Sequence, residues 1–276
     1  MLALLHAGAS FSLTSFSIHW STVVGLSVLA CLYEWRARKI PDVTRGRRLC
    51  FYGGLVTVFL SLNGPLHDLS DYYLFSAHMV QHLVLTLVVP PLLIVGTPGS
   101  MLRPTLQFPI IARVARALTR PMVCFATFNV VLAAWHLPVL YNYAMAHHNV
   151  HIVQHLMFMA ASVMLWWPVL SQLPELPRLS YPMQMLYLFL TSIPMSIVAV
   201  YITYSSALLY PAYAGASRVL PLTPMEDQLL GGLIMWIPGG LVFFGVITVI
   251  FFRWQSHGAE DSVASAQVDW RSASGV

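Results

Sequence analysis

Two histidine pairs in matching surroundings are the part of this sequence best suited to chemistry. The string HMVQHL begins at His78, the string HIVQHL begins at His151, and each leads directly into a long apolar segment. In a helix, residues four apart lie on the same face, about 6 Å from each other. An unpartnered polar group inside a bilayer costs several kcal/mol, so packing alone explains two such pairs poorly. The pairs therefore predict a metal site.

Imidazole and carboxylate ligands suit copper, zinc, iron or nickel. The candidate metal ligands are His78, His82, His151, His155, His136, His67 and Asp227. For Asp227, the alternative is a helix cap, because acidic residues favour helix N-termini. Thioethers at compatible depths would favour Cu(I), although methionine is also ordinary filler in apolar cores. These methionines are Met79, Met145, Met225 and Met235.

The composition predicts an all-α integral membrane protein, because 58% of the 276 residues are hydrophobic and only 9% are charged. Apolar runs near the length of about 17–25 residues that a span needs predict a bundle of seven transmembrane helices. The runs centre on Ser21–Trp35, Leu49–Leu62, Tyr73–Val95, Pro121–Pro138, Val150–Leu170, Met183–Tyr204 and Leu229–Phe252.

The basic residues predict the orientation of the bundle. Six of them crowd the loop between the first two helices, and short basic loops stay in the cytoplasm. Alternation from there leaves Arg218 as the only basic residue outside, with the N-terminus outside and the C-terminus inside. The same topology places every histidine except His257 on the outer side. We therefore expect the chemistry to face the exterior or periplasm.

The chain divides into a single membrane domain and two short flanks. Residues 1–17 are expected to form an external segment without the features of a removable signal peptide, residues 18–253 the membrane domain, and residues 254–276 a disordered cytoplasmic tail. The net charge of +4 follows from the uneven loops, so it does not indicate a nucleic-acid partner.

The chain also repeats itself at a spacing of about 75 residues. His78, His151 and Asp227 each lie near the predicted start of a helix that carries a proline further along. One helix followed by three related hairpins would account for seven spans.

Several function classes lack their motifs in this sequence. There is no phosphate-binding loop, dinucleotide fingerprint or nucleophile elbow, and the three cysteines form no CxxC pair. We therefore predict no catalytic residues, no energy-coupled pumping and no thiol-based chaperone chemistry.

Four segments together resemble the membrane-integral CtaG family, the assembly factors of caa-type cytochrome oxidases. They are PLHDLSDYYLFSAHMVQHLVLTLVVPPLLIVGTP (65–98), AWHLPVLYNYAM (134–145), HIVQHLMF (151–158) and MEDQLLGGLIMWIPGG (225–240). The resemblance implies a multi-pass protein of the bacterial plasma (inner) membrane that helps to mature a haem-copper oxidase. It implies copper as the metal, delivered to an oxidase subunit and received from a periplasmic copper donor.

Two other functions fit the histidines. A membrane electron-transfer protein could hold a haem between His82 and His155, although one haem would leave the second histidine of each pair unused. A copper or zinc permease would need ligands through the full membrane thickness, whereas the inner half offers only Cys31, Cys50 and Cys124.

Overall fold

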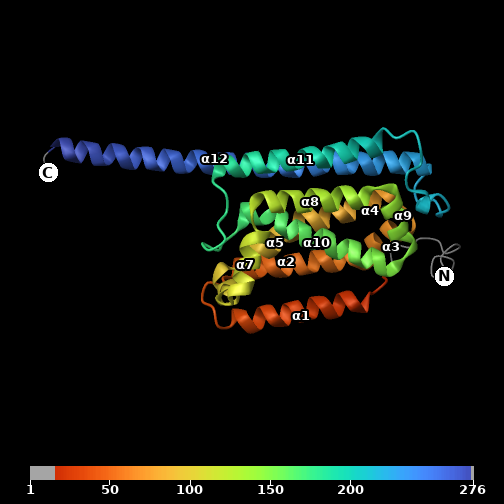
Figure 1. The fold of residues 1–276 in the computed structure, drawn as a ribbon, viewed down its shortest axis with the longest axis horizontal. Helices are drawn as coiled ribbons and strands as arrows, with labels where there is room; N and C mark the ends of the chain where they lie inside the picture. Colours follow the sequence, from red (N-terminus) through yellow and green to blue (C-terminus); the bar gives the residue numbers. More distant parts are fainter. Residues whose placement is uncertain (1–15, 275–276) are drawn as a thin grey trace.

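Long helices run side by side along one axis in the computed structural model, which describes residues 16–274 and the side chains of residues 16–256 (Figure 1). The α-helices are α1 (Trp20–Ala37), α2 (Arg45–Leu62), α3 (Pro65–Tyr72), α4 (Phe75–Leu83), α5 (Val89–Gly96), α6 (Gly99–Leu102), α7 (Pro109–Leu118), α8 (Pro121–His136), α9 (Pro138–Ala146), α10 (His148–Leu170), α11 (Tyr181–Thr203) and α12 (Pro224–Ser274). A π-helical turn, η2 (Val84–Val88), joins α4 to α5, and the 3-10 turns are η3 (Arg103–Gln107) and η4 (Pro211–Tyr213). No strand occurs in residues 16–274, so the all-α fold is confirmed. The predicted external segment 1–17 lies almost wholly outside the described residues.

Four helical stretches are long and apolar enough to cross a membrane: Phe75–Gly96, His148–Leu170, Tyr181–Thr203 and Pro224–Ser256. Two bent pairs add one span each if each pair is counted as a unit. They are Arg45–Leu62 with Pro65–Tyr72, bent by 46°, and Pro109–Leu118 with Pro121–His136, bent by 67°. The described residues thus contain four to six candidate spans, compared with the seven predicted.

The predicted span that is missing even from the count of six is the first one, where α1 forms. Glu34 and Arg36 occupy its last turn, so its uncharged part covers about 14 residues, or about 21 Å, against a hydrocarbon core of about 30 Å. The helix lies beside α2 at the edge of the bundle, where Tyr33 stacks on Phe51 with ring centroids 3.7 Å apart (Figure 1). The number of spans and the orientation of the chain therefore remain predictions.

A proline fixes how the histidine-bearing helix α4 joins α5. Pro90 has no N–H to donate to the carbonyl of Thr86, four residues earlier, and the backbone there widens into η2. The indole Nε1 of Trp166 in α10 donates to that Thr86 carbonyl at 3.0 Å. The carbonyl left free by the break thus gains a hydrogen bond from a side chain of α10, and this bond fixes α4 and α10 relative to each other.

The predicted repeat is visible in the helix registers. His78, His151 and Asp227 are each the fourth residue of their helices, α4, α10 and α12. The helix α12 packs on α11 and α4, whereas α10 packs on α8, α5 and η2. Large buried side chains such as Phe158 and Trp166 fill the space between these helices.

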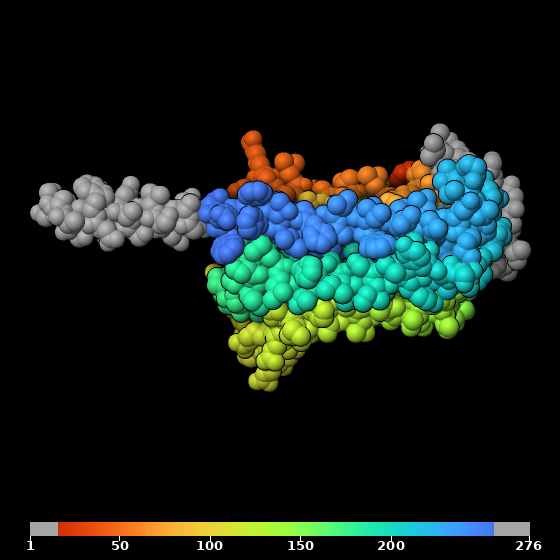
Figure 2. Space-filling model, turned by 90° about the horizontal axis from the view of Figure 1, so that it is seen from above, coloured from red at the N-terminus to blue at the C-terminus, as the bar shows by residue number. Residues whose placement is uncertain are grey.

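Two features differ from the sequence-based expectations. The short helix α7 exposes Ile110 and Val114 beside two arginines, as helices at a membrane surface do, and Figure 2 shows this yellow segment projecting from one end. Sequence analysis predicted only a basic loop there. The helix α12 continues to Ser274, where a disordered tail was expected.

Glycine 232 allows α12 to lie close against α11. A Cβ added at Gly232 would lie 2.9 Å from the backbone N of Thr203, whereas one added at Gly240 in the same helix meets nothing within 4 Å. We predict that Gly232→Ala lowers the unfolding free energy by about 1–3 kcal/mol through overpacking. Gly240→Ala should be neutral or stabilising, by up to about 1 kcal/mol, because alanine favours helix. Thermal unfolding of the detergent-solubilised protein tests this, and equal melting temperatures for both variants would contradict the close contact.

Candidate metal centre

The four histidines of the repeated motif converge between α4 and α10. The rings of His78 and His151 are stacked with centroids 5.5 Å apart, and the rings of His82 and His155 are 5.3 Å apart. Within each helix, the two rings are 4.2 Å and 4.5 Å apart, respectively. Two imidazoles that share one ion through bonds of about 2.0–2.1 Å have centroids no more than about 6.5 Å apart. The spacing therefore suits shared metal coordination.

These four imidazoles are buried, and seven of their eight ring nitrogens lack a hydrogen-bond partner in the part of the chain that the structure describes. Each ring is at most 7% exposed. Among the described residues, nothing hydrogen-bonds to either ring nitrogen of His78, His82 or His155, or to Nε2 of His151. Buried polar atoms are usually paired, because an unpaired one costs about 1–3 kcal/mol. A cluster of such atoms is thus suited to binding a cation.

A carboxylate that sequence analysis did not select completes this cluster. Asp71 in α3 lies with its Oδ2 3.4 Å from Nδ1 of His151 and 3.4 Å from Nε2 of His67. One ligand atom each from Asp71, His78 and His151 lie within 4.8 Å of one another. The spacing of Asp71 four residues after His67 was the signal that could have identified it. We call Asp71, His78, His82, His151 and His155 the outer cluster.

His67 supports the outer cluster by holding Asp71. The side-chain amide of Gln81 donates to the Ser61 carbonyl at 2.6 Å, which fixes the amide orientation, and its Nε2 is 3.3 Å from Nδ1 of His67. Nδ1 is then the acceptor, so Nε2 of His67 carries the proton that faces Asp71. His67 therefore acts as an orienting residue, of the kind that commonly surrounds metal ligands.

His136 lies on the far side of His82 from this carboxylate. Its Nδ1 is 2.7 Å from the carbonyl of Leu132, so Nδ1 is the protonated nitrogen and Nε2 has a free lone pair. The rings of His136 and His82 are 6.1 Å apart. The sequence-predicted ligands His82, in the last turn of α4, and His136, the last residue of α8, are therefore adjacent.

Asp227 lies at the beginning of α4, where it accepts hydrogen bonds. Its carboxylate accepts from the backbone N–H of Phe75 at 2.7 Å, from the N–H of Ser76 at 3.1 Å and from the Ser76 hydroxyl at 2.5 Å. Sequence analysis offered a metal ligand or a cap of its own helix. The structure shows a third arrangement, in which α12 caps α4 and thereby sets the height of His78.

Three tyrosines, which sequence analysis did not single out, cover the outer end of the cluster. The ring of Tyr141 is 5.2 Å from that of His78, and its hydroxyl is 2.9 Å from the hydroxyl of Tyr213. Tyr213 donates to the carbonyl of Ser70 at 2.7 Å, and Tyr210 donates to that of His136 at 2.8 Å. Burial raises the pKa of Tyr210 and of Tyr213, so both phenols stay protonated and keep these contacts.

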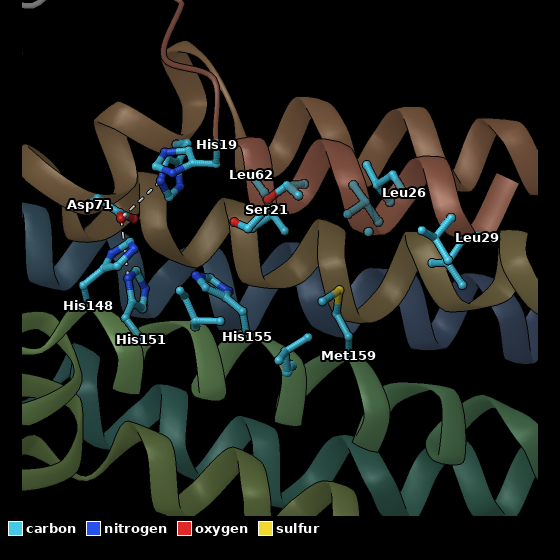
Figure 3. Close-up of a pocket in the computed structure, with 17 residues that line it drawn as sticks. His19, Ser21, Leu26, Leu29, Leu62, Asp71, His148, His151, His155 and Met159 are labelled. Carbon is cyan, nitrogen blue, oxygen red and sulfur yellow. Dashed lines mark ion pairs between the residues drawn. The ribbon is translucent and has the colours of Figure 1, made fainter. Parts of the chain in front are cut away.

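A pocket of about 600 Å³ leads to the outer cluster from the side of the bundle, between α1, α2 and α10. Figure 3 shows His19, His148, His151 and Asp71 at one end of it and Leu26, Leu29 and Met159 at the other. His19 contacts His67 with ring centroids 4.4 Å apart. His19 and His148, which were not among the predicted ligands, thus line the approach to the buried imidazoles.

The two aspartates should respond differently to loss of charge. We predict that Asp227→Asn lowers the melting temperature, since an amide can accept fewer of the three hydrogen bonds, but leaves metal stoichiometry unchanged. Asp71→Asn should weaken metal binding with a smaller effect on stability. Thermal unfolding and equilibrium metal titration of both purified variants measure this. Loss of metal binding in Asp227→Asn without a change in melting temperature would contradict the capping role.

Comparison with known proteins identifies the family. The family model of the cytochrome c oxidase caa3 assembly factor matches residues 26–257. Uncharacterized proteins of Mycobacterium bovis and Mycobacterium tuberculosis are each 23% identical over 197 residues, which cover 66% of this chain and only 30% of each relative. No solved structure matches. Because the family match covers most of the chain, this protein belongs to the cytochrome c oxidase caa3 assembly factor family.

Proposed function

We propose that this protein captures copper at the outer cluster and hands it to a subunit of a haem-copper oxidase in the same membrane. The observation that carries the proposal is the convergence of buried, unpartnered imidazole nitrogens on the carboxylate of Asp71. Copper is the cargo in this account, and no reaction is catalysed. Family membership supports a role in oxidase assembly.

The donor set favours binding that can be reversed. Imidazole and carboxylate groups suit copper, but they lack the thiolates that would hold it in a tight cage. The three cysteines do not join the cluster. Cys31 lies on α1 and Cys50 on α2, while Cys124, near the start of α8, donates to the carbonyl of Leu118 at the end of α7. A carrier has to release its ion, so ligands of this kind are suited to transfer.

The distribution of charge supports an outward-facing cluster in the bacterial inner membrane. Arg36, Arg48 and Arg103 contact groups at the end of the bundle opposite α3 and α9 (Figure 1). Short basic segments stay in the cytoplasm, so the histidine end would face the periplasm. A periplasmic copper donor would then reach the cluster past His19 and His148.

The bundle interior favours transfer to a partner over transport across the membrane. Beyond the histidines, Leu165, Trp166, Leu188 and Phe243 are each at most 1% exposed, so large apolar side chains fill much of the interior there. The side pocket, in contrast, opens between apolar faces of α1 and α10. An oxidase subunit docked in the membrane could therefore receive the ion laterally.

Metal content tests this proposal directly. We expect the purified wild-type protein to carry copper by elemental mass spectrometry, and the His78→Ala/His82→Ala variant to lack it, because the variant removes four imidazole nitrogens. His147→Ala is the matched control, since His147 is exposed and its ring lies against Tyr143, with centroids 4.2 Å apart, rather than in the cluster. The control should retain copper.

Other outcomes would contradict copper capture. Iron with a Soret absorption band in the wild type would favour the haem alternative. Uptake of copper or zinc into sealed vesicles that contain only this protein would favour a permease. Wild-type protein that binds no metal even when copper is supplied would contradict the proposal.

A further inference from the structure

We infer that the protein has a second, inner copper site, selective for Cu(I), formed by His82, His136 and the thioethers of Met79, Met195 and Met235. This inference rests on the proposed function, because it places a second binding step behind the outer cluster. The five side chains come from α4, α8, α11 and α12. They line a cavity of about 20 Å³, which also contacts Phe128 and Phe158. That volume is about enough for one water molecule or one small ion.

The two imidazoles of this cavity have the correct spacing and free nitrogens. Their ring centroids are 6.1 Å apart, within the limit of about 6.5 Å for two imidazoles on one ion. His82 is 5% exposed, and neither of its ring nitrogens has a hydrogen-bond partner among the described residues. In His136 the bond from Nδ1 to the Leu132 carbonyl leaves Nε2 as the metal-binding nitrogen.

The three methionines give this cavity a soft character that the outer cluster lacks. Met79, Met195 and Met235 are each at most 3% exposed and line one cavity although they come from three helices. Thioethers are soft ligands that bind Cu(I). Among the side chains of residues 16–256, no carboxylate lines the cavity. The donor set therefore favours a monovalent soft ion.

Glycines of α12 make room for two of these methionines. A Cβ added at Gly239 would lie 2.8 Å from Cε of Met195, and one added at Gly231 would overlap the Phe75 ring and lie 3.3 Å from Cγ of Met79. The close approach of α12 thus brings both thioethers toward the same cavity. This convergence favours a metal-binding role for these methionines over ordinary core packing, which was the alternative in the sequence analysis.

His82 belongs to both sites and links them. Its ring lies 5.3 Å from His155 in the outer cluster and 6.1 Å from His136 in the inner site. An ion can therefore exchange ligands one at a time and remain bound. Copper stays Cu(I) throughout, so the transfer needs no electron donor or acceptor.

The test supplies Cu(I) anaerobically, with a competing Cu(I) chelator, to the full-length protein in detergent. Wild type should bind two ions per chain, and X-ray absorption should show sulfur among the copper ligands. In Met79→Leu/Met195→Leu/Met235→Leu, which removes all three thioethers by nearly isosteric changes, we expect one ion, no sulfur scattering and an unchanged melting temperature. Met101→Leu changes a buried methionine far from the cavity and should behave as wild type.

The outcomes separate the inner site from the proposed function. Two ions and unchanged sulfur scattering in Met79→Leu/Met195→Leu/Met235→Leu would overturn the inner site. Sulfur scattering that disappears in Cys124→Ser would also overturn it. A wild type with one ion, nitrogen and oxygen ligands only, and loss of that ion in Asp71→Asn would overturn the inner site and leave copper capture intact. No bound Cu(I) in wild type would overturn both.

Discussion

The structure depends on the cost of burying polar groups inside an apolar bundle. With no water available in a bilayer, each buried donor or acceptor needs a partner within the protein. Most of the bundle meets this requirement: Asp227 accepts three hydrogen bonds at the start of α4, and Trp166 donates to the carbonyl that Pro90 leaves unpaired. The paired histidines do not, and their rings lie together between α4 and α10. The same physical rule that explains the scaffold thus identifies the candidate site.

The scaffold places these histidines by contacts between distant parts of the chain. Asp227 sets the height of α4 from α12, and the Trp166 indole fixes α4 against α10. Tyr213 holds α3, and with it Asp71, through the Ser70 carbonyl. Each contact joins two helices, so the geometry of the cluster is a property of the packed bundle rather than of any single helix.

The site residues that could be predicted from the sequence are those identified by a local spacing pattern. The spacing of His78 and His82, repeated in α10, predicted two faces that indeed converge, because helix geometry alone puts residues i and i+4 together. Asp71 was missed because its position depends on the bend of 46° between α2 and α3, which occurs at Gly64 with a φ of 71°. The role of Asp227 depends on a contact 151 and 152 residues away, which no local pattern encodes. The charged last turn of α1 limits the number of spans, and its effect could have been read from the sequence.

The most direct test of the central claim is the position of copper in the folded protein. Crystals of copper-loaded protein, measured above and below the copper absorption edge, would locate the ion by anomalous scattering. The account predicts a peak between the carboxylate of Asp71 and the imidazoles of His78 and His151. A copper peak only elsewhere, with ordered waters hydrogen-bonded to these imidazoles, would contradict it.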